Sequence, residues 1–235
     1  MMSDTDQPLA IPLWINGHAY LTMAPAFFDV RDARSGEVRR RTPMCGAGEA
    51  LSAVSSAQAA LASWGARAGA ERAALLAALG DALAGYDDHF AGLISEESGK
   101  DSALAVAEVG AAVRLLRSAP ASATSTGGSA VVAIVSDDGA PLLGAVRHAV
   151  PALLAGATVV VKPSPKAPSA AFALAELSAR CAFPGGVFNI LHGDLAAIEG
   201  LCSASEVSLL RFAGDAALGA RVAAIAARHG KAFVD

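Results

Sequence analysis

The strongest constraint on this chain is a regular alternation of strand-like and helix-like segments between residues 130 and 235. At its centre lie four consecutive β-branched residues, Thr158-Val159-Val160-Val161, preceded by Gly156 and followed by Lys162-Pro163. A β-branched run between a glycine and a proline predicts a short strand that is buried on both faces. Strands of this kind belong to parallel sheets covered by helices on both sides.

The segments around this strand repeat the same pattern. The other expected strands are Val131 to Val135, Val187 to Leu191, Val207 to Phe212 and Ala232 to Val234. The expected helices between them cover residues 142–154, 168–181, 194–201 and 215–229. Five strands separated by helices predict an α/β fold with a doubly wound, mostly parallel sheet.

The first half of the chain has a different character. Asn16-Gly17 separates Leu13 to Ile15 from His18 to Tyr20 and predicts a tight hairpin, and a second turn is expected at Ser35-Gly36. We expect these short strands to form an accessory sheet on the main body.

Amphipathic helices are expected next, over residues 47–64, from residue 70, over 88–98 with Gly99 as its end, and over 102–117. The predicted organisation is a tail (1–10), a hairpin and helical region packed on the core (11–117), a linker or loop (118–129) and the core (130–235), together one compact domain.

Composition excludes several classes of function. The net charge is -4 without a basic patch, which gives no electrostatic support for nucleic-acid binding. No apolar run is long enough to span a membrane, and acidic residues stand at the amino terminus where a signal peptide would be basic. The three cysteines, Cys45, Cys181 and Cys202, lack metal-ligand spacing, so we expect reduced thiols in a cytoplasmic protein and no metal site.

Two features suggest a ligand site. Lys162 follows a buried strand, and ligands of open α/β sheets lie beyond the carboxyl ends of the strands, although a lysine there can also simply extend to solvent. Gly214 to Gly219 follows a strand and opens a helix, which suits either a phosphate or a purely steric turn. His192 is compatible with a ligand contact or with an internal hydrogen bond in a turn.

Eight segments in register resemble the aldehyde dehydrogenase superfamily, over nearly the whole chain. They are Trp14-Ile15-Asn16-Gly17, Ser35-Gly36-Glu37-Val38, Ala70-Glu71-Arg72, Glu97-Ser98-Gly99-Lys100, the 151–156 segment PALLAG, Val160-Val161-Lys162-Pro163-Ser164, the 184–189 segment PGGVFN, and 212–219. The resemblance implies a Rossmann-like NAD(P)-binding domain, a separate catalytic domain and an oligomerisation hairpin. Gly139-Ala140-Pro141 is most similar to the branch that oxidises aromatic aldehydes.

The resemblance also assigns cofactor-binding residues. Lys162, with Ser164 in the same motif, would bind the adenosine ribose of NAD or NADP, and Gly193 would lie near the adenine. The Gly214–Gly219 turn would face the pyrophosphate, with Phe212 packed at the end of the adjoining strand.

Departures from the family pattern fall on the residues that carry its chemistry. The oxyanion-stabilising asparagine is replaced by Gly139, which donates no side-chain hydrogen bond. The serine that donates to the pyrophosphate is Asp215, and the acid that holds a ribose hydroxyl is Pro165. The chain ends at Asp235, before the segments that supply the general base and the nucleophilic cysteine, and 120–130 is too short for the oligomerisation hairpin.

These departures leave three hypotheses. The first is an aldehyde-dehydrogenase-like protein without catalytic residues of its own, silent alone, acting as a partner or structural subunit. The second is the cofactor-binding half of a split NAD(P)-dependent dehydrogenase. The third is a non-catalytic nucleotide-binding module. We expect NAD(P) to bind weakly or not at all. We also expect a protein partner or a second copy over the surface that the catalytic domain covers in the family, at apolar residues such as Phe233 and Val234.

Overall fold

The computed structural model describes residues 8–119 and 130–235 of the chain. Its main sheet has the strand order β2-β1-β7-β6-β5-β8-β9. The strands are β1 (Leu13–Ile15), β2 (His18–Tyr20), β5 (Val131–Ser136), β6 (Thr158–Lys162), β7 (Phe188–Ile190), β8 (Val207–Ala213) and β9 (Ala232–Val234). The five strands from β7 to β9 pair in parallel, as a doubly wound sheet requires. A separate antiparallel ribbon consists of β3 (Phe27–Arg31) and β4 (Val38–Pro43).

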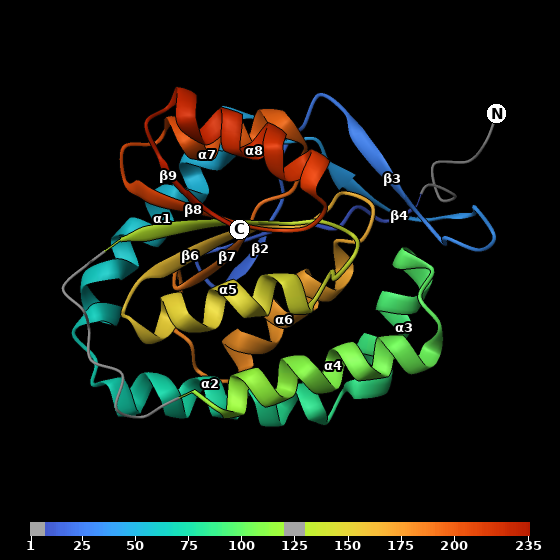
Figure 1. Ribbon diagram of the computed structural model, residues 1–235, viewed down its shortest axis with the longest axis horizontal. Coiled ribbons are helices and arrows are strands. Elements are labelled where there is room, and N and C mark those ends of the chain that lie inside the picture. Colours follow the sequence, from blue (N-terminus) through green and yellow to red (C-terminus); the bar gives the residue numbers. More distant parts are fainter. Residues whose placement is uncertain (1–7, 120–129) are drawn as a thin grey trace.

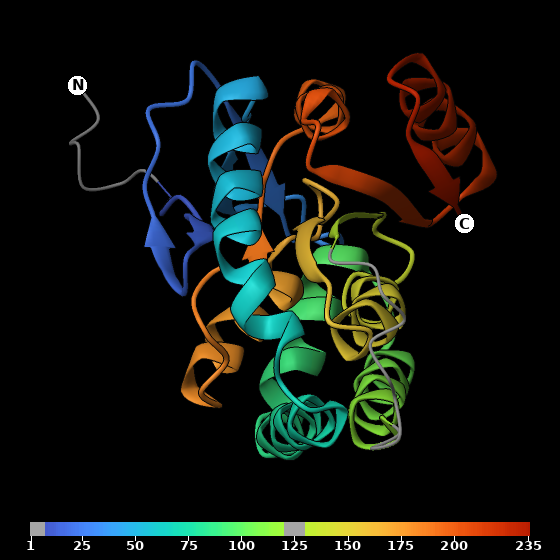
Figure 2. The same ribbon diagram turned by 90° about the vertical axis from the view of Figure 1, so that its left-hand side faces the viewer.

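Helices cover both faces of this sheet (Figure 1). One face carries α1 (Ala47–Gly65), α7 (Leu195–Ser203) and α8 (Ala216–Arg228), and the other carries α5 (Leu143–Leu154) and α6 (Ser169–Arg180). A further layer lies beyond α5 and α6 and consists of α2 (Gly69–Ala84), α3 (Asp87–Ser98) and α4 (Ser102–Arg117). Figure 2 shows the β1–β2 hairpin and β9 at opposite edges of the main sheet.

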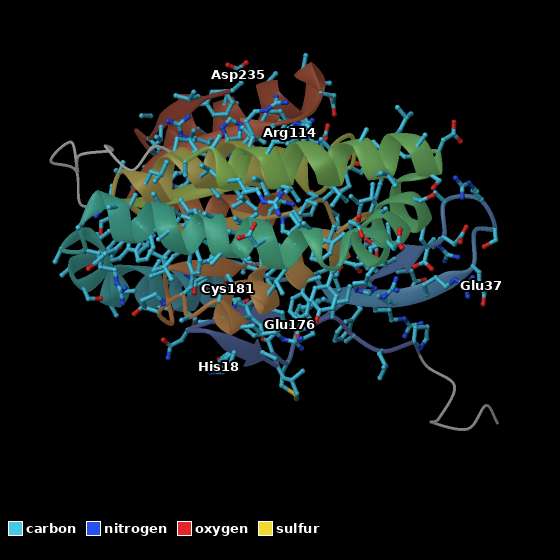
Figure 3. The ribbon with its side chains drawn as sticks, turned by 90° about the horizontal axis from the view of Figure 1, so that it is seen from below. His18, Glu37, Arg114, Glu176, Cys181 and Asp235 are labelled. Atoms are coloured by element: carbon cyan, nitrogen blue, oxygen red, sulfur yellow. The ribbon has the colours of Figure 1, made fainter. Side chains whose placement is uncertain are left out.

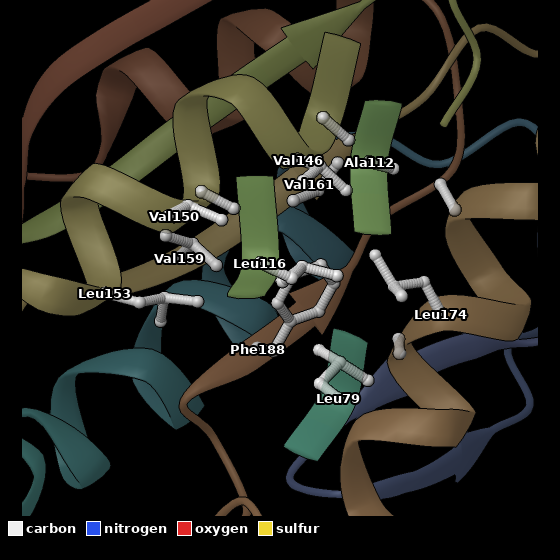
Figure 4. Close-up of a cluster of buried hydrophobic side chains, with 14 of the residues drawn as sticks. Leu79, Ala112, Leu116, Val146, Val150, Leu153, Val159, Val161, Leu174 and Phe188 are labelled. Carbon is white, nitrogen blue, oxygen red and sulfur yellow. The ribbon is translucent and has the colours of Figure 1, made fainter. Parts of the chain in front are cut away.

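The core is built from the β-branched strands. Every residue of β6 is buried, as predicted from its uninterrupted apolar run. Val159 and Val161 face the cluster of α5, α6 and the outer helices, shown in Figure 4, whereas Val160 faces the cluster formed with α1, α7 and α8. The side chains alternate between the two faces because successive residues of a strand point in opposite directions.

Most predicted elements are confirmed to within two residues, and two turns form for the expected reason. Asn16 and Gly17 both have positive φ (56° and 77°), as the predicted tight hairpin needs. Gly99 ends α3 in the left-handed conformation with φ 74°. The predicted tail and linker fall partly on residues 1–7 and 120–129, which lie outside the described residues.

The predicted accessory sheet is wrong for the first hairpin. β1 pairs antiparallel with β7, through Trp14 opposite Ile190, and so extends the main sheet to seven strands. All of β1 is buried, because Leu13 and Ile15 pack on one helical layer and Trp14 on the other. Among the described strands, only β3 and β4 form a separate sheet.

The order of the strands also locates a crevice. The chain proceeds from β5 through β6 to β7 in one direction, and β8 and β9 lie on the other side of β5. Ligands of open α/β sheets bind where the winding direction reverses, beyond the carboxyl ends of the strands. Here that point lies between the ends of β5 and β8.

Candidate functional site

A cavity of about 1050 Å³ lies at the carboxyl ends of β5 and β8. Three acidic residues, Asp137, Asp215 and Asp235, contribute to its wall. Arg147 and His148 of α5 contribute nitrogen groups. Its other lining residues are small or apolar: Gly139, Ala140, Gly144, Phe212, Ala213, Gly214, Ala216, Gly219, Ala220, Ala223 and Phe233.

The amino end of α8 faces this cavity and is capped by its own chain. The Asp215 carboxylate Oδ1 accepts hydrogen bonds from the backbone N–H groups of Ala217 (2.8 Å) and Leu218 (2.9 Å). The first N–H groups of a helix have no partner within the helix, and aspartate is a strongly preferred cap for them. The carboxylate therefore occupies the donors that an anionic ligand would use.

A second carboxylate reinforces this turn from the end of β5. Asp137 Oδ2 accepts from the backbone N–H of Asp215 (2.7 Å), and Asp137 Oδ1 accepts from that of Gly139 (2.8 Å). A Cβ on Gly214 would lie 2.5 Å from Asp137 Oδ2 and 2.7 Å from Phe212 Cζ. Residue 214 must therefore be glycine for Asp137 to approach the turn this closely.

These contacts do not fit a dinucleotide pyrophosphate at the Gly214–Gly219 turn. Three backbone donors, the N–H groups of Asp215, Ala217 and Leu218, already bind carboxylate oxygens. A pyrophosphate at the same place would lie beside two negative charges, and like charges repel more strongly in a partly enclosed site than in bulk water. A helix amino end that normally favours anions thus has its own anions in place.

Lys162 is buried rather than extended to solvent, with 4% of its surface exposed. Its Nζ donates to the carbonyl oxygens of Pro163 (2.9 Å) and Gly193 (3.0 Å). Burial lowers the pKa of the ammonium group to about 8, with the nearby charge of Asp194 acting in the opposite direction. The lysine connects the end of β6 to the turn before α7.

The other predicted cofactor residues fall into two groups. Phe212, Gly214 and Gly219 line the cavity together, and the Phe212 ring stacks on Phe233 with centroids 6.5 Å apart. Gly193 accepts from Lys162 through its carbonyl oxygen and has φ 126°.

Ser164 is buried, with 6% of its surface exposed, and follows the end of β6 at Lys162. Its Oγ donates to Asp138 Oδ1 (3.2 Å). Ser164, Lys162 and Gly193 are absent from the cavity wall formed by the described residues.

His192 is held inside the fold. Its Nε2 lies 3.0 Å from the Pro12 carbonyl oxygen, and Nδ1 has no hydrogen-bond partner among the described residues. Burial lowers its pKa to about 4. The second of the two interpretations, an internal turn histidine, is the one that the geometry supports.

Three cavity features were missed in the sequence. No sequence motif singles out Asp137, because its contact with α8 depends on β5 and β8 being neighbours. Arg147 lines both this cavity and a second one of about 370 Å³ between α4 and α5, which Arg114 also lines. Figure 3 shows Arg114 on α4. No carboxylate among the described residues pairs with either arginine. The sequence did contain one sign of this cavity, which is an arginine on an otherwise apolar face of α4 and another on such a face of α5.

Two structural features are absent from residues 8–119 and 130–235. No group of three histidine, cysteine, aspartate or glutamate residues is arranged to hold a metal ion there. No described helix combines the length and the apolar character that crossing a membrane requires.

Comparison with known proteins agrees with the architecture. The chain is 30% identical over 210 residues to the NADP-dependent succinate-semialdehyde dehydrogenase of Escherichia coli K12, covering 81% of this chain and 44% of that protein. It is 31% identical over 214 residues to a glutarate-semialdehyde dehydrogenase of Pseudomonas aeruginosa, covering 83% and 44%. The chain thus spans about half the length of the curated relatives it matches.

The fold also matches that of a solved structure. The lactaldehyde dehydrogenase of Escherichia coli superimposes with a TM-score of 0.88 at 25% identity, covering 97% of this chain and 52% of that one. The profile of the aldehyde dehydrogenase family matches residues 21–234. The chain therefore belongs to the aldehyde dehydrogenase family and corresponds to the amino-terminal, NAD(P)-binding portion of its longer members.

Proposed function

We propose that this chain does not oxidise aldehydes by itself and that it acts as a partner or structural subunit. The observation that carries the proposal is the occupation of the α8 amino end by the Asp215 and Asp137 carboxylates. A dehydrogenase must hold its dinucleotide, and this turn presents negative charge where the family presents a donor. We infer that NAD or NADP binds weakly or not at all.

The reactive groups within these 235 residues support the same proposal. Burial raises the pKa of the Cys45 thiol to about 12 and of the Cys202 thiol to about 11. Cys181 is half-buried, and its pKa is also raised by burial. Since the thiolate is the nucleophile, none of these environments favours attack on an aldehyde. Gly139, in place of the asparagine, offers no oxyanion donor from its side chain.

Activity of the purified chain is the direct test. We expect no NAD(P)H formation above a protein-free blank with NAD⁺ or NADP⁺ and a panel of aldehydes that includes succinate semialdehyde and an aromatic aldehyde. The Cys181→Ser variant is the control for slow, non-specific thiol chemistry. Oxidation of any aldehyde above background by the wild type would refute the proposal.

A second candidate function is the cofactor-binding half of a split dehydrogenase, with the nucleophile and base on another polypeptide. The observation that favours it is the cavity lined by Arg114 and Arg147, together with Ala111, Leu115, Ser118 and Leu143. Two arginines that pair with no carboxylate of residues 8–119 and 130–235, beside apolar residues, suit an aldehyde that carries a carboxylate. Succinate- and glutarate-semialdehyde dehydrogenases are among the relatives. Gly139 argues against this candidate, because the missing asparagine belongs to this half.

Reconstitution distinguishes the two candidates. A split enzyme gains activity when the chain is mixed with a polypeptide that supplies a family-type catalytic domain, and it loses affinity for a carboxylate-bearing substrate in Arg147→Gln. A silent subunit gains no activity under the same conditions. A neighbouring gene for such a catalytic polypeptide would favour the split enzyme, and its absence would count against it.

We also propose that a protein partner, or a second copy of the chain, covers the β9 side of the sheet. Val234 is 40% exposed and Phe233 is half-buried at this edge. An edge strand with unpaired backbone groups and apolar side chains favours association. A solution mass above that of the monomer, which returns to the monomer in Val234→Lys, would support a second copy. If the wild type is monomeric in solution, a second copy is excluded, and the proposed partner is a different protein.

The third candidate, a nucleotide-binding module without chemistry, makes a separate prediction. It requires measurable NAD or NADP affinity in the absence of any turnover. Calorimetric titration distinguishes it from the silent subunit, because the silent subunit gives no heat at millimolar nucleotide.

A further inference from the structure

Two glutamates of the outer helical layer reach across to cap helices of the sheet layer. Glu97, near the end of α3, has 1% of its side chain exposed, and Glu108 of α4 has 4%. Glu97 Oε2 accepts from the backbone N–H of Ser169 (3.0 Å), the first residue of α6, and its Oε1 accepts from the Ser169 hydroxyl. Each glutamate thus serves a helix other than its own.

Glu108 makes the equivalent contact with α5. Its Oε1 accepts from the backbone N–H groups of Leu142 (2.9 Å) and Leu143 (3.0 Å). Its Oε2 forms an ion pair with Lys100. Lys100 and Glu97 come from the same Glu97-Ser98-Gly99-Lys100 corner between α3 and α4. From this corner Glu97 caps α6 directly, and Lys100 pairs with Glu108, which caps α5.

Each capped helix is entered from one of the two connections beside the candidate site. Residues 137–142 lead from β5 into α5 and contain Asp137 and Gly139 of the cavity wall. Residues 163–168 lead from β6 into α6 and contain Ser164. The two connections also meet, because Ser164 Oγ donates to Asp138 Oδ1 (3.2 Å).

We propose that Glu97 and Glu108 are positioning residues, which hold the 163–168 and 137–142 connections in place from the outer helical layer. Each glutamate supplies acceptor oxygens to N–H groups at the start of a helix, which have no partner within that helix. Removing either glutamate leaves buried N–H groups without acceptors. The importance of these connections for a dinucleotide rests on the proposed function, whereas the capping contacts do not.

The contact made by Glu97 depends on pH. Burial raises the pKa of Glu97 to about 7; its hydrogen bonds from Ser169 and the charge of Arg40 on β4 oppose this, while neighbouring Glu96 on α3 adds to it. A carboxyl group whose pKa is raised in the folded state binds its proton more tightly there than when it is exposed. Opening of the α6 amino end therefore becomes easier as the pH rises from the ordinary value of 4.5 to about 7.

Amide exchange of the full chain without nucleotide tests the proposal. We expect Glu97→Ala to accelerate exchange at Ser169 by about tenfold or more while Leu142 and Leu143 change little, and Glu108→Ala to do the reverse. Asp88→Ala is the control on the same helix, because Asp88 is an exposed residue in the first turn of α3, whereas Glu97 lies at the other end of that helix. Equal acceleration at both helices in both variants, or no acceleration, would overturn the proposal.

The pH dependence of amide exchange is a second readout. A contact at Ser169 that did not involve titration of Glu97 would give a flat pH profile. In the wild type, protection of Ser169 relative to its intrinsic exchange rate should fall by about tenfold or more between pH 5 and pH 7. Glu97→Gln keeps the shape without the titration, so it should restore protection relative to Glu97→Ala and show a flat profile. A flat wild-type profile, or an equal slope in Glu97→Gln, contradicts the assignment even if the alanine variants do not fold. Because no nucleotide is present, either outcome leaves the NAD(P) proposal to its own test.

Discussion

The carboxylate of Asp137, at the end of β5, accepts a hydrogen bond of 2.7 Å from the backbone N–H of Asp215, at the start of α8. Asp215 uses its own carboxylate to cap the same helix. Two side chains from neighbouring strand ends therefore close the turn that the family resemblance assigns to a pyrophosphate.

The Asp215 cap should contribute measurably to stability. We expect Asp215→Ala to lower the free energy of unfolding by about 1 kcal/mol, because two helix N–H groups lose their acceptor. Asp101→Ala is the matched control: Asp101 stands at the same position of α4 but makes no side-chain cap. Its effect should stay below about 0.5 kcal/mol in the same denaturant titration. Equal costs for the two variants would mean that the Asp215 contact is not formed in solution.

Gly214 should tolerate no side chain while Asp137 is present. Its added Cβ would lie 2.5 Å from Asp137 Oδ2, so we expect Gly214→Ala to cost about 1–3 kcal/mol of stability. In a double-mutant cycle with Asp137→Ala the two effects should not add, because the second change removes one of the clashing groups. Gly48→Ala in α1, where a Cβ meets nothing within 4 Å, should be neutral or stabilise by up to about 1 kcal/mol. Strict additivity in the cycle would contradict the contact.

The buried histidine predicts a loss of stability in acid. The pKa of His192 is lowered to about 4 from 6.5, so the unfolded chain binds more protons between these values. Stability should therefore fall as the pH drops from 6.5 toward 4, by an amount on the order of 3 kcal/mol. His192→Gln should reduce this dependence, whereas His18→Gln, at an exposed position, should leave it unchanged. Identical pH profiles for the wild type and His192→Gln would exclude a buried neutral histidine.

Thiol labelling should separate the three cysteines. Cys45 and Cys202 are buried with raised pKa values, and Cys181 is half-buried. We expect iodoacetamide to modify Cys181 alone in the native protein, and all three thiols after denaturation, as counted by mass spectrometry. Rapid labelling of Cys45 or Cys202 in the native protein would reveal an accessible thiolate and would reopen the question of a nucleophile.

Local patterns in the sequence predict most of the elements but few of the contacts between them. The 158–162 strand follows from its β-branched run between a glycine and a proline, and the 102–117 helix follows from its amphipathic pattern. The position of β1 does not, because its partner β7 lies about 175 residues away along the chain and the hairpin looks self-sufficient. Asp215 is recognisable as a cap from its place before a helix.

The role of Asp137 and the shared cavity of Arg114 and Arg147 required the tertiary structure. Asp137 and Asp215 meet only because β5 and β8 are adjacent in the sheet. Arg114 and Arg147 meet only because α4 packs across α5. Family resemblance identified which residues had changed, and the geometry supplied what the replacements do.

The most direct test of the central claim is a calorimetric titration of NAD⁺ and NADP⁺ into the wild type and into the Asp137→Ala/Asp215→Ser double variant. Removing both carboxylates restores a hydroxyl at the turn and frees the α8 amino end for an anion. We predict no heat for the wild type at millimolar nucleotide, and measurable binding for the double variant. Micromolar binding by the wild type, unchanged in the double variant, would contradict the account.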